Sequence, residues 1–168
     1  MTTIGLIVLI ATALGFDFTN GFHDAANSVA TAIATRALRP AAALGMAGVL
    51  NVVGALVSTK VASTVGKGII TTPSGTAALT IVFAALVGGI IWNLFTWRLG
   101  LPSSSTHALI GGLVGAAIGS AGTVKWHGLL NKVVVPMAAS PLIGIALGYV
   151  SMLAILWVFH RVRPGPVN

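Results

Sequence analysis

A polar stretch at residues 15–28 carries the groups of this sequence that could bind or move an ion. It holds both acidic residues of the chain, Asp17 and Asp24, together with His23 and Asn27. A carboxylate at the centre of a membrane costs at least about 2.5–3.5 kcal/mol, and such groups are kept where they face a cavity or coordinate an ion. On a helix that starts near His23, Asp24 and Asn27 share one face. Two side-chain oxygens there suit a hard monovalent cation, whereas Asp24 with His23 can equally carry a proton.

The same stretch also fits a simpler structural role, as a connecting loop at the membrane surface in which Asp24 caps a helix N-terminus. Gly21 permits the backbone to leave the helical conformation, so we expect the first membrane segment to be broken there. We expect Asp17 to be a turn or interface residue rather than a ligand. Asn20 is a secondary candidate for the ion site.

A second polar stretch, residues 100–107, suits an anion. Pro102 favours the start of a helix, and four hydroxyl residues follow it on the expected first turn: Ser103, Ser104, Ser105 and Thr106. Backbone N–H groups in a first helical turn have no intrahelical partners and carry a partial positive charge that binds phosphate-like anions. The simpler alternative is N-capping by one serine, with the others in a loop. His107 is either a buried hydrogen-bonded residue or a secondary partner of the anion or proton.

We expect the two stretches to meet within the bilayer, as the half-helix ends of secondary transporters do. Asp24 would itself repel an anion, so a cation between the two stretches would be a natural coupling element.

The composition places these stretches in a membrane protein. Of the 168 residues, 56% are hydrophobic and 7% are charged, whereas a soluble domain has about 25% charged residues. This excludes both a soluble globular domain and a disordered chain. The absence of cysteine excludes disulfides and thiolate metal sites. The net charge of +7 does not indicate nucleic-acid binding, because the 9 lysines and arginines are scattered between long apolar runs.

The elements that must position the two polar stretches are membrane helices, and a membrane span needs about 20 mostly apolar residues. Besides the interrupted first segment at residues 4–35, the segments without charge are 40–59, 77–97, 99–124 and 133–159. We therefore predict an all-α polytopic membrane protein with about five membrane segments, including broken or re-entrant half-helices. We expect residues 1–168 to form a single transmembrane domain. Segment 99–124 either crosses or re-enters, and the arrangement of arginines and lysines is too even to fix the orientation.

Three further features concern the helices. Pro136 and Pro141 are expected to kink the last segment. The glycines Gly111, Gly115 and Gly119, at four-residue spacing, predict close helix packing within one subunit. A signal peptide over residues 1–13 is disfavoured because no lysine or arginine precedes its apolar run.

The two polar stretches resemble the signatures of the inorganic phosphate transporter (PiT) family. Residues 20–28 (NGFHDAANS) are similar to its first signature, Gly-Ala-Asn-Asp-Val-Ala-Asn-Ala. Residues 101–112 (LPSSSTHALIGG) resemble its Pro-(Ser/Thr)-Ser-Thr-His motif. The resemblance extends over nearly the whole chain. It implies a multi-pass transporter of the plasma membrane, not an enzyme, that takes up inorganic phosphate with protons or sodium.

The resemblance also implies which residues act. Matching positions assign the coupling ion to Asp24 and Asn27, and phosphate to the four hydroxyl residues at 103–106. The family's asparagine before the signature aspartate is His23 here, and this titratable group favours a proton-coupled member of bacterial type. No resident cofactor or metal is implied. The substrate is phosphate itself or a neutral complex of phosphate with a divalent metal.

One departure from the family concerns the number of repeats. The family is built from two inverted repeats, each with its own signature, and this chain has one copy of each motif. It therefore resembles the N-terminal half of the family. Three explanations are open: the chain is a fragment, it pairs with a second half-length protein, or it forms an antiparallel homodimer.

Two other functional classes are considered. An intramembrane hydrolase that uses Ser105, His107 and Asp24 is disfavoured, because residues two apart on a helix point to different sides and no Gly-x-Ser-x-Gly elbow is present. A channel or a non-transporting regulatory half also fits the polar stretches, because such groups line pores too.

Overall fold

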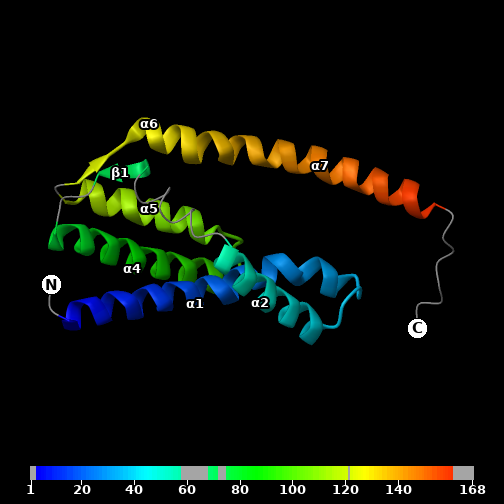
Figure 1. The fold of residues 1–168 in the computed structure, drawn as a ribbon, viewed down its shortest axis with the longest axis horizontal. Helices are drawn as coiled ribbons and strands as arrows, with labels where there is room; N and C mark the ends of the chain where they lie inside the picture. Colours follow the sequence, from blue (N-terminus) through cyan, green and yellow to red (C-terminus); the bar gives the residue numbers. More distant parts are fainter. Residues whose placement is uncertain (1–2, 58–67, 72–74, 121, 161–168) are drawn as a thin grey trace. The chain divides into compact units, whose positions relative to one another are not determined.

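The structure, a computed structural model, describes residues 3–57, 68–71, 75–120 and 122–160. Most of these residues are helical (Figure 1). In chain order, the elements are α1 (Thr3–Ala34), α2 (Pro40–Val57), β1 (Ile70–Thr71), α4 (Thr76–Arg98), α5 (Ser105–Ile118), β2 (Thr123–Val124), α6 (Trp126–Leu129), the π-helical turn η1 (Leu130–Val134) and α7 (Val135–Phe159). The two short strands pair with each other in antiparallel fashion. The predicted all-α polytopic class is confirmed.

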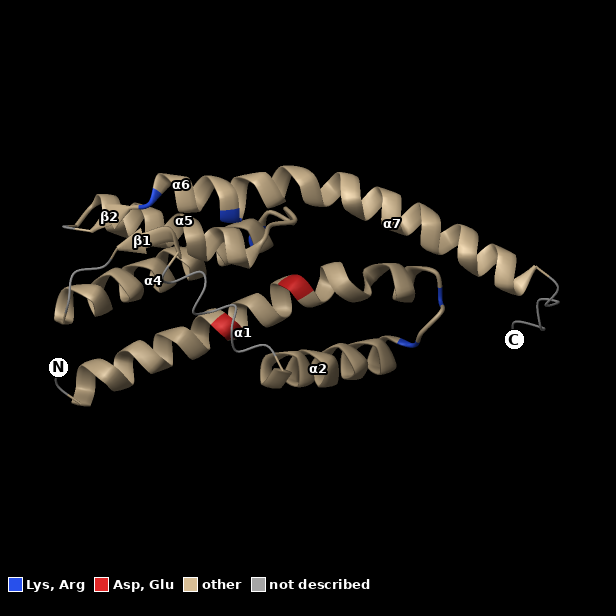
Figure 2. Ribbon diagram, turned by 45° about the horizontal axis from the view of Figure 1, so that its top comes forward, with Lys and Arg blue, Asp and Glu red and all other residues tan. Residues whose placement is uncertain are grey.

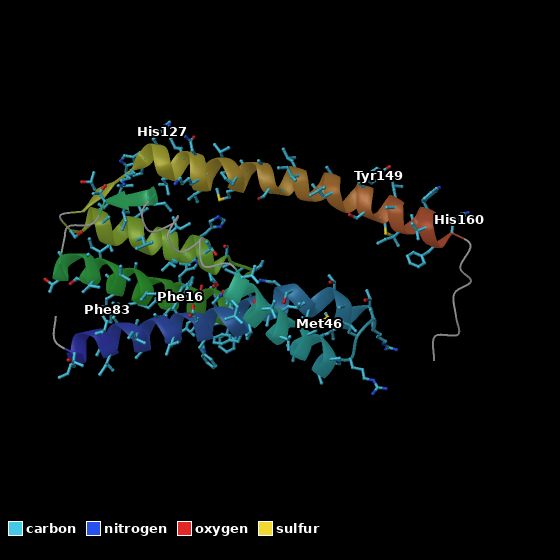
Figure 3. All side chains as sticks on the ribbon, in the orientation of Figure 1. Phe16, Met46, Phe83, His127, Tyr149 and His160 are labelled. Carbon is cyan, nitrogen blue, oxygen red and sulfur yellow. The ribbon has the colours of Figure 1, made fainter. Side chains whose placement is uncertain are left out.

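The chain divides into two units, residues 1–125 and 126–168. In the first unit, α4 packs against both α5 and α1, and α2 packs against α1. Buried apolar side chains hold these contacts together: Phe16 of α1 lies between α1 and α4 (Figure 3), and Ile81 and Leu113 are buried on α4 and α5. The helices α1 and α5, which carry the polar stretches, thus share one core with α4, which lies between them in the chain.

The first membrane segment is not broken, contrary to the prediction. α1 is a single helix of 32 residues that runs through Gly21 without interruption. A glycine within a helix costs about 1 kcal/mol relative to alanine, which a long helix with its backbone bonds intact tolerates. Asp24 therefore lies in mid-helix, so the loop with an N-capping Asp24 is also wrong. Asp17 lies two turns earlier in the same helix and not in a turn.

Four helical stretches are long and apolar enough to cross a membrane, by length and composition. They are α1, α2, α4 and the 34-residue stretch Trp126–Phe159, which joins α6, η1 and α7. α5 has 14 residues and is about 21 Å long, which is shorter than the hydrocarbon core of about 30 Å. Its length favours the re-entrant form of segment 99–124 over a full crossing. The last two residues of segment 40–59 lie outside the described residues.

The positions of the charged residues fit the arrangement of these candidate spans. Figure 2 shows both acidic residues in the middle of α1, whereas Arg36 and Arg39 lie in the connection between α1 and α2. Basic residues near the ends of spans are typical of membrane proteins. The two carboxylates are the exception, because they lie inside a helix that is long and apolar enough to span a membrane, where charge is expensive.

Close helix packing in the first unit depends on glycines other than the predicted ones. A Cβ added at Gly112 of α5 would lie 2.6 Å from the backbone oxygen of Ala85 in α4. A Cβ added at Gly89 of α4 would lie 2.8 Å from the Phe16 ring. Gly111 and Gly115 have open space at that position. The predicted close approach therefore exists, but the ladder that was expected to make it faces elsewhere.

The second unit is a helix with an irregular beginning. In η1 the backbone N–H of Val135 donates to the carbonyl of Leu130, five residues back. Pro136 follows directly and has no N–H, so the α-helical bond to residue 132 cannot form, and the wider turn precedes it. The helix then continues through Pro141. None of the residues of α7 is buried within the described chain, and Tyr149 projects from its surface (Figure 3).

Candidate functional site

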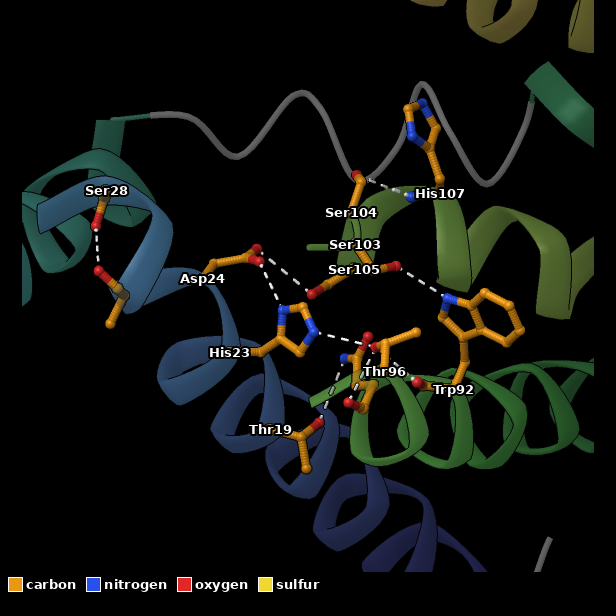
Figure 4. A network of polar contacts seen from close by, with 12 residues as sticks. Thr19, His23, Asp24, Ser28, Trp92, Thr96, Ser103, Ser104, Ser105 and His107 are labelled. Atoms are coloured by element: carbon orange, nitrogen blue, oxygen red, sulfur yellow. Dashed lines mark hydrogen bonds and ion pairs between the residues drawn. The ribbon is translucent and has the colours of Figure 1, made fainter. Parts of the chain in front are cut away.

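The buried polar side chains of the described residues lie in one region. They are Thr19 and His23 of α1, Asn93 and Thr96 of α4, and Ser105 of α5. Each of the three helices is otherwise apolar on its packed face, so these groups form a polar seam inside an apolar core (Figure 4). Buried polar groups at membrane depth are expensive and mark functional sites by default.

His23 is the centre of this seam. Its Nδ1 lies 3.2 Å from Oδ1 of Asp24, and its Nε2 lies 3.1 Å from Oγ1 of Thr96. The hydroxyl of Thr96 in turn donates within α4, to the carbonyl of Trp92 at 2.9 Å or of Asn93 at 3.2 Å. The imidazole is therefore held from both sides, by its own helix and by α4.

Asp24 connects the two predicted polar stretches. The Ser105 hydroxyl donates to Oδ2 of Asp24 at 3.4 Å, across 81 residues of sequence. Ser105 is buried, whereas 44% of the Asp24 side chain is exposed. The two stretches are in contact here, as predicted, although Asp24 lies in mid-helix and not at the end of a half-helix. The open side of Asp24 leaves room for an ion.

A second pair extends the seam deeper between α1 and α4. The side-chain amide of Asn93 donates to Oγ1 of Thr19 at 3.5 Å, and Thr19 donates to the carbonyl of Phe16. The side-chain oxygens of Asn93 and Asn20 are buried and have no hydrogen-bond partner among the described residues. An unpaired buried acceptor costs about 1–3 kcal/mol, so these two oxygens are free to accept from a bound species.

The N-terminus of α5 differs in detail from the prediction. The helix begins at Ser105 and not at Pro102, because Ser104 is its N-cap: the Ser104 side chain accepts the His107 N–H at 3.3 Å. The first intrahelical bond runs from the Ala108 N–H to the Ser104 carbonyl. The N–H groups of Ser105 and Thr106 precede it and are the unpaired donors of a helix start.

The four hydroxyl residues consequently do not act as one set. Ser103 accepts a hydrogen bond from the Trp92 indole at 2.9 Å, Ser104 caps, and Ser105 turns toward Asp24. Thr106 is exposed. The capping alternative thus holds for Ser104, and Ser103 lies in the preceding loop.

Three cavities lined by described residues lie beside the seam. The largest, about 650 Å³ between α1 and α2, is lined by Asp17, Asn20 and Asp24 on α1 and by Asn51 on α2. A cavity of about 470 Å³ between α4 and α5 is lined by Ser103, Ser104, His107 and Trp92. A cavity of about 310 Å³ is lined by residues of α1, α4 and the loop before α5, among them His23 and Asn27.

This division separates residues that the sequence grouped together. Asp24 and Asn27 are three residues apart, but they line different cavities. Asp17, which was expected not to be a ligand, lines the same cavity as Asp24, as does Asn20. His107 is exposed and points away from Asp24 (Figure 4), so it does not join the contact between Ser105 and Asp24 as the base of a hydrolase would.

The comparison with known proteins identifies the family. A model of the phosphate transporter family matches residues 20–166, which include both motif segments, residues 20–28 and 101–112. The chain belongs to this family. The membership predicted from the two motifs is therefore confirmed. With its long apolar helices, the chain is a multi-pass protein of the plasma membrane.

The related proteins are bacterial phosphate transporters by name. A probable low-affinity inorganic phosphate transporter of Streptomyces halstedii is 56% identical over 163 residues, which are 97% of this chain and 76% of the relative. One of Mycobacterium bovis is 49% identical over 95% of this chain. The low-affinity inorganic phosphate transporter PitB of Escherichia coli is 35% identical over 91% of it. No solved structure matches the chain.

The chain spans only part of most of these relatives. It covers 37% of the Mycobacterium bovis protein and 34% of the Escherichia coli protein. It also covers 49% of a probable low-affinity inorganic phosphate transporter of Bacillus subtilis.

Proposed function

We propose that this chain is one half of a secondary transporter that carries inorganic phosphate across the plasma membrane together with protons. The observation that carries the proposal is the contact of Ser105 with Asp24. It brings the donor-rich start of α5 against a carboxylate in the interior of a helix that is long and apolar enough to span a membrane. Family membership and the names of the relatives support phosphate as the substrate.

Phosphate would bind at the start of α5. The N–H groups of Ser105 and Thr106 and the hydroxyls of Ser103 and Thr106 supply donors without adding a positive charge, while Ser104 caps the helix and Ser105 holds Asp24. The anion can therefore bind and still leave. A divalent-metal complex of phosphate is an alternative form of the substrate, and the uncovered carboxylates of Asp17 and Asp24 line a cavity beside this site.

The coupling ion would neutralise Asp24 when phosphate arrives. An ionised Asp24 beside Ser105 repels an anion, so a cation bound at Asp24 lets phosphate bind next to it. The contact between His23 and Asp24 favours a proton in this role. Sodium, bound by oxygens of Asp24 and Asn27, is the other candidate, although these residues line different cavities.

A carrier of this kind would need a second half. We propose that residues 1–168 act as one transmembrane domain that pairs with a second repeat or with an inverted copy of itself. The fraction of the relatives that the chain covers supports this. A channel or a regulatory half is the competing function.

Uptake of radioactive phosphate into proteoliposomes tests the proposal. The full chain is reconstituted with its second half, and a proton gradient or a sodium gradient is imposed separately. We expect concentrative uptake with the proton gradient alone, and counterflow when unlabelled phosphate is loaded inside. Flux without counterflow indicates a channel, and uptake that follows only sodium contradicts proton coupling.

A further inference from the structure

The hydrogen-bond partners of the buried Thr96 hydroxyl favour one position for the hydrogen of neutral His23. Thr96 is 3% exposed, and its hydroxyl oxygen lies 2.9 and 3.2 Å from two carbonyl oxygens of its own helix. The hydroxyl has one hydrogen, so while it donates that hydrogen to one of these carbonyls it can only accept from His23. The 3.1 Å contact then requires the hydrogen on Nε2 of His23.

This assignment determines the other side of the ring. A neutral imidazole with its hydrogen on Nε2 has a lone pair on Nδ1. That lone pair would face Oδ1 of Asp24 at 3.2 Å, and two acceptors repel each other at this distance. The contact becomes a hydrogen bond when one more proton is present between the two atoms. Imidazolium with carboxylate satisfies this requirement, and so does neutral imidazole with carboxylic acid.

We propose that Thr96 is a positioning residue that makes the contact between His23 and Asp24 depend on one bound proton. The proton comes from the aqueous side, binds between Nδ1 and Oδ1, and is released from the same place. When it leaves, Asp24 is repelled from the ring and moves toward the cavity that it already lines. This movement breaks or changes the contact with Ser105, so proton loss reaches the start of α5.

The role in coupling rests on the proposed function, but the hydrogen-bond assignment does not. A water-facing aspartate alone binds a proton without any preference for one neighbour. The Thr96 contact adds a condition: as long as Thr96 donates within α4, the buried ring cannot satisfy ionised Asp24 by a change of tautomer. Without Thr96, a neutral His23 could move its hydrogen to Nδ1 and donate to ionised Asp24, and the contact would then need no extra proton.

Every variant used in a test must leave the other titratable groups on the packed helices unchanged. They are Asp17 of α1, Arg98 in the last turn of α4, and His107 of α5, while α2 carries none. Asp17 lines the cavity of Asp24, whereas His107 points away from the pair (Figure 4).

Nuclear magnetic resonance of the full chain in lipid nanodiscs tests the assignment. Histidine is labelled with ¹⁵N and aspartate with ¹³C, and the spectrum of His23→Gln identifies the His23 signals among the 4 histidines. At high pH we expect neutral His23 to carry its hydrogen on Nε2. At lower pH we expect a proton to appear at Nδ1 or at the Asp24 carboxyl group while Nε2 keeps its own. Neutral His23 protonated on Nδ1 overturns the proposal.

Thr96→Val gives the decisive variant, because valine has the shape of threonine without the acceptor. The ratio of the Nε2–H form to the Nδ1–H form should fall at least about fivefold, as expected for the loss of one net hydrogen bond. Thr96→Ser should restore the ratio. Thr80→Val is the matched control, since Thr80 is an exposed threonine of the same helix. An unchanged ratio in Thr96→Val contradicts the proposal, and if this variant does not fold, the wild-type spectrum decides.

A transport measurement then separates this inference from the proposed function. In the assembled carrier, Thr96→Val should flatten the pH profile of phosphate uptake, and Thr96→Ser should restore it. An unchanged pH profile in Thr96→Val overturns the coupling role of Thr96. Absence of transport by the wild-type assembly contradicts the proposed function, while the tautomer of His23 is still decided by the spectra.

Discussion

At the scale of single residues, Asp24 is the point at which the chain's two polar stretches meet. It contacts His23 on its own helix and Ser105 on α5, and its remaining surface is open to a cavity. A carboxylate in a membrane segment is costly, and such groups are kept where they face a cavity or an ion pathway. The partial exposure of Asp24 is the feature expected of a group that binds and releases an ion.

Asp24→Asn should abolish ion-driven phosphate uptake while the protein still folds. Asparagine has nearly the same shape and can accept from Ser105, but it cannot take up a proton or carry a negative charge. We expect the initial rate of proton-driven uptake in proteoliposomes to fall at least about tenfold, since hydrogen bonds to charged groups contribute about 1.5–3 kcal/mol.

Asp17→Asn is the matched control for this experiment. Asp17 lies on the same helix and lines the same cavity, but its side chain is two turns away from the contact with Ser105. We expect a smaller loss of uptake than for Asp24→Asn. Wild-type uptake by Asp24→Asn would show that this carboxylate does not bind the coupling ion.

The sequence predicted one side of the polar seam and missed the other. Asp24, His23 and Ser105 stand in dense polar stretches, so their types and spacing drew attention. Asn93 and Thr96 are isolated polar residues in the otherwise apolar α4, and a single polar residue in a span rarely indicates which helix it will face. Their three-residue spacing, which puts both on one helix face, was the available signal.

At the scale of elements, the polar residues of α1 are accommodated without breaking the helix. The sequence argument assumed that charged groups in mid-membrane would need an irregular backbone. Instead, α4 covers one face of α1 with hydrogen-bonding partners, and the cavity between α1 and α2 leaves another face open. A prediction from one segment could not include these neighbours, because they come from elements about 20 and 70 residues away.

Gly112→Ala should destabilise the contact between α4 and α5. The added Cβ would meet the backbone oxygen and Cα of Ala85 at 2.6 and 3.1 Å, and backbone atoms cannot turn aside as a side chain can. Overpacking of this kind typically costs about 1–3 kcal/mol. We expect a lower apparent unfolding temperature in detergent, measured by tryptophan fluorescence or by size-exclusion after heating.

Gly111→Ala provides the comparison, because the adjacent glycine has open space at its Cβ position. Alanine there should leave the unfolding temperature unchanged or raise it, since alanine favours the helix over glycine by about 1 kcal/mol. Equal destabilisation by the two variants would contradict the packing of α5 on α4 through Gly112. The sequence predicted glycine-mediated packing but not which of two adjacent glycines faces α4, since that depends on the rotation of α5.

At the scale of the whole molecule, the scarcity of charge limits what the chain can do alone. Two acids in 168 residues supply one contact between a carboxylate and the start of α5. An inverted-repeat carrier places such a pair in each half, so that the site lies between two related halves. This chain covers a minority of the Mycobacterium bovis relative and has no second copy of either motif.

The chain reconstituted alone in a single orientation should therefore give at most about a tenth of the uptake seen with a second half. Half a site loses several hydrogen bonds to the anion, and each 1.4 kcal/mol lost in binding weakens it about tenfold. The part of the Mycobacterium bovis relative that this chain does not match serves as the second half.

Because the sequence contains no cysteine, one cysteine introduced at Ala37, between α1 and α2, reports orientation by its reaction with an impermeant thiol reagent. Full uptake by the chain alone, with label on one side only, contradicts the need for a second half. Full uptake with label on both sides instead supports the antiparallel homodimer, because only inverted copies could then complete the site.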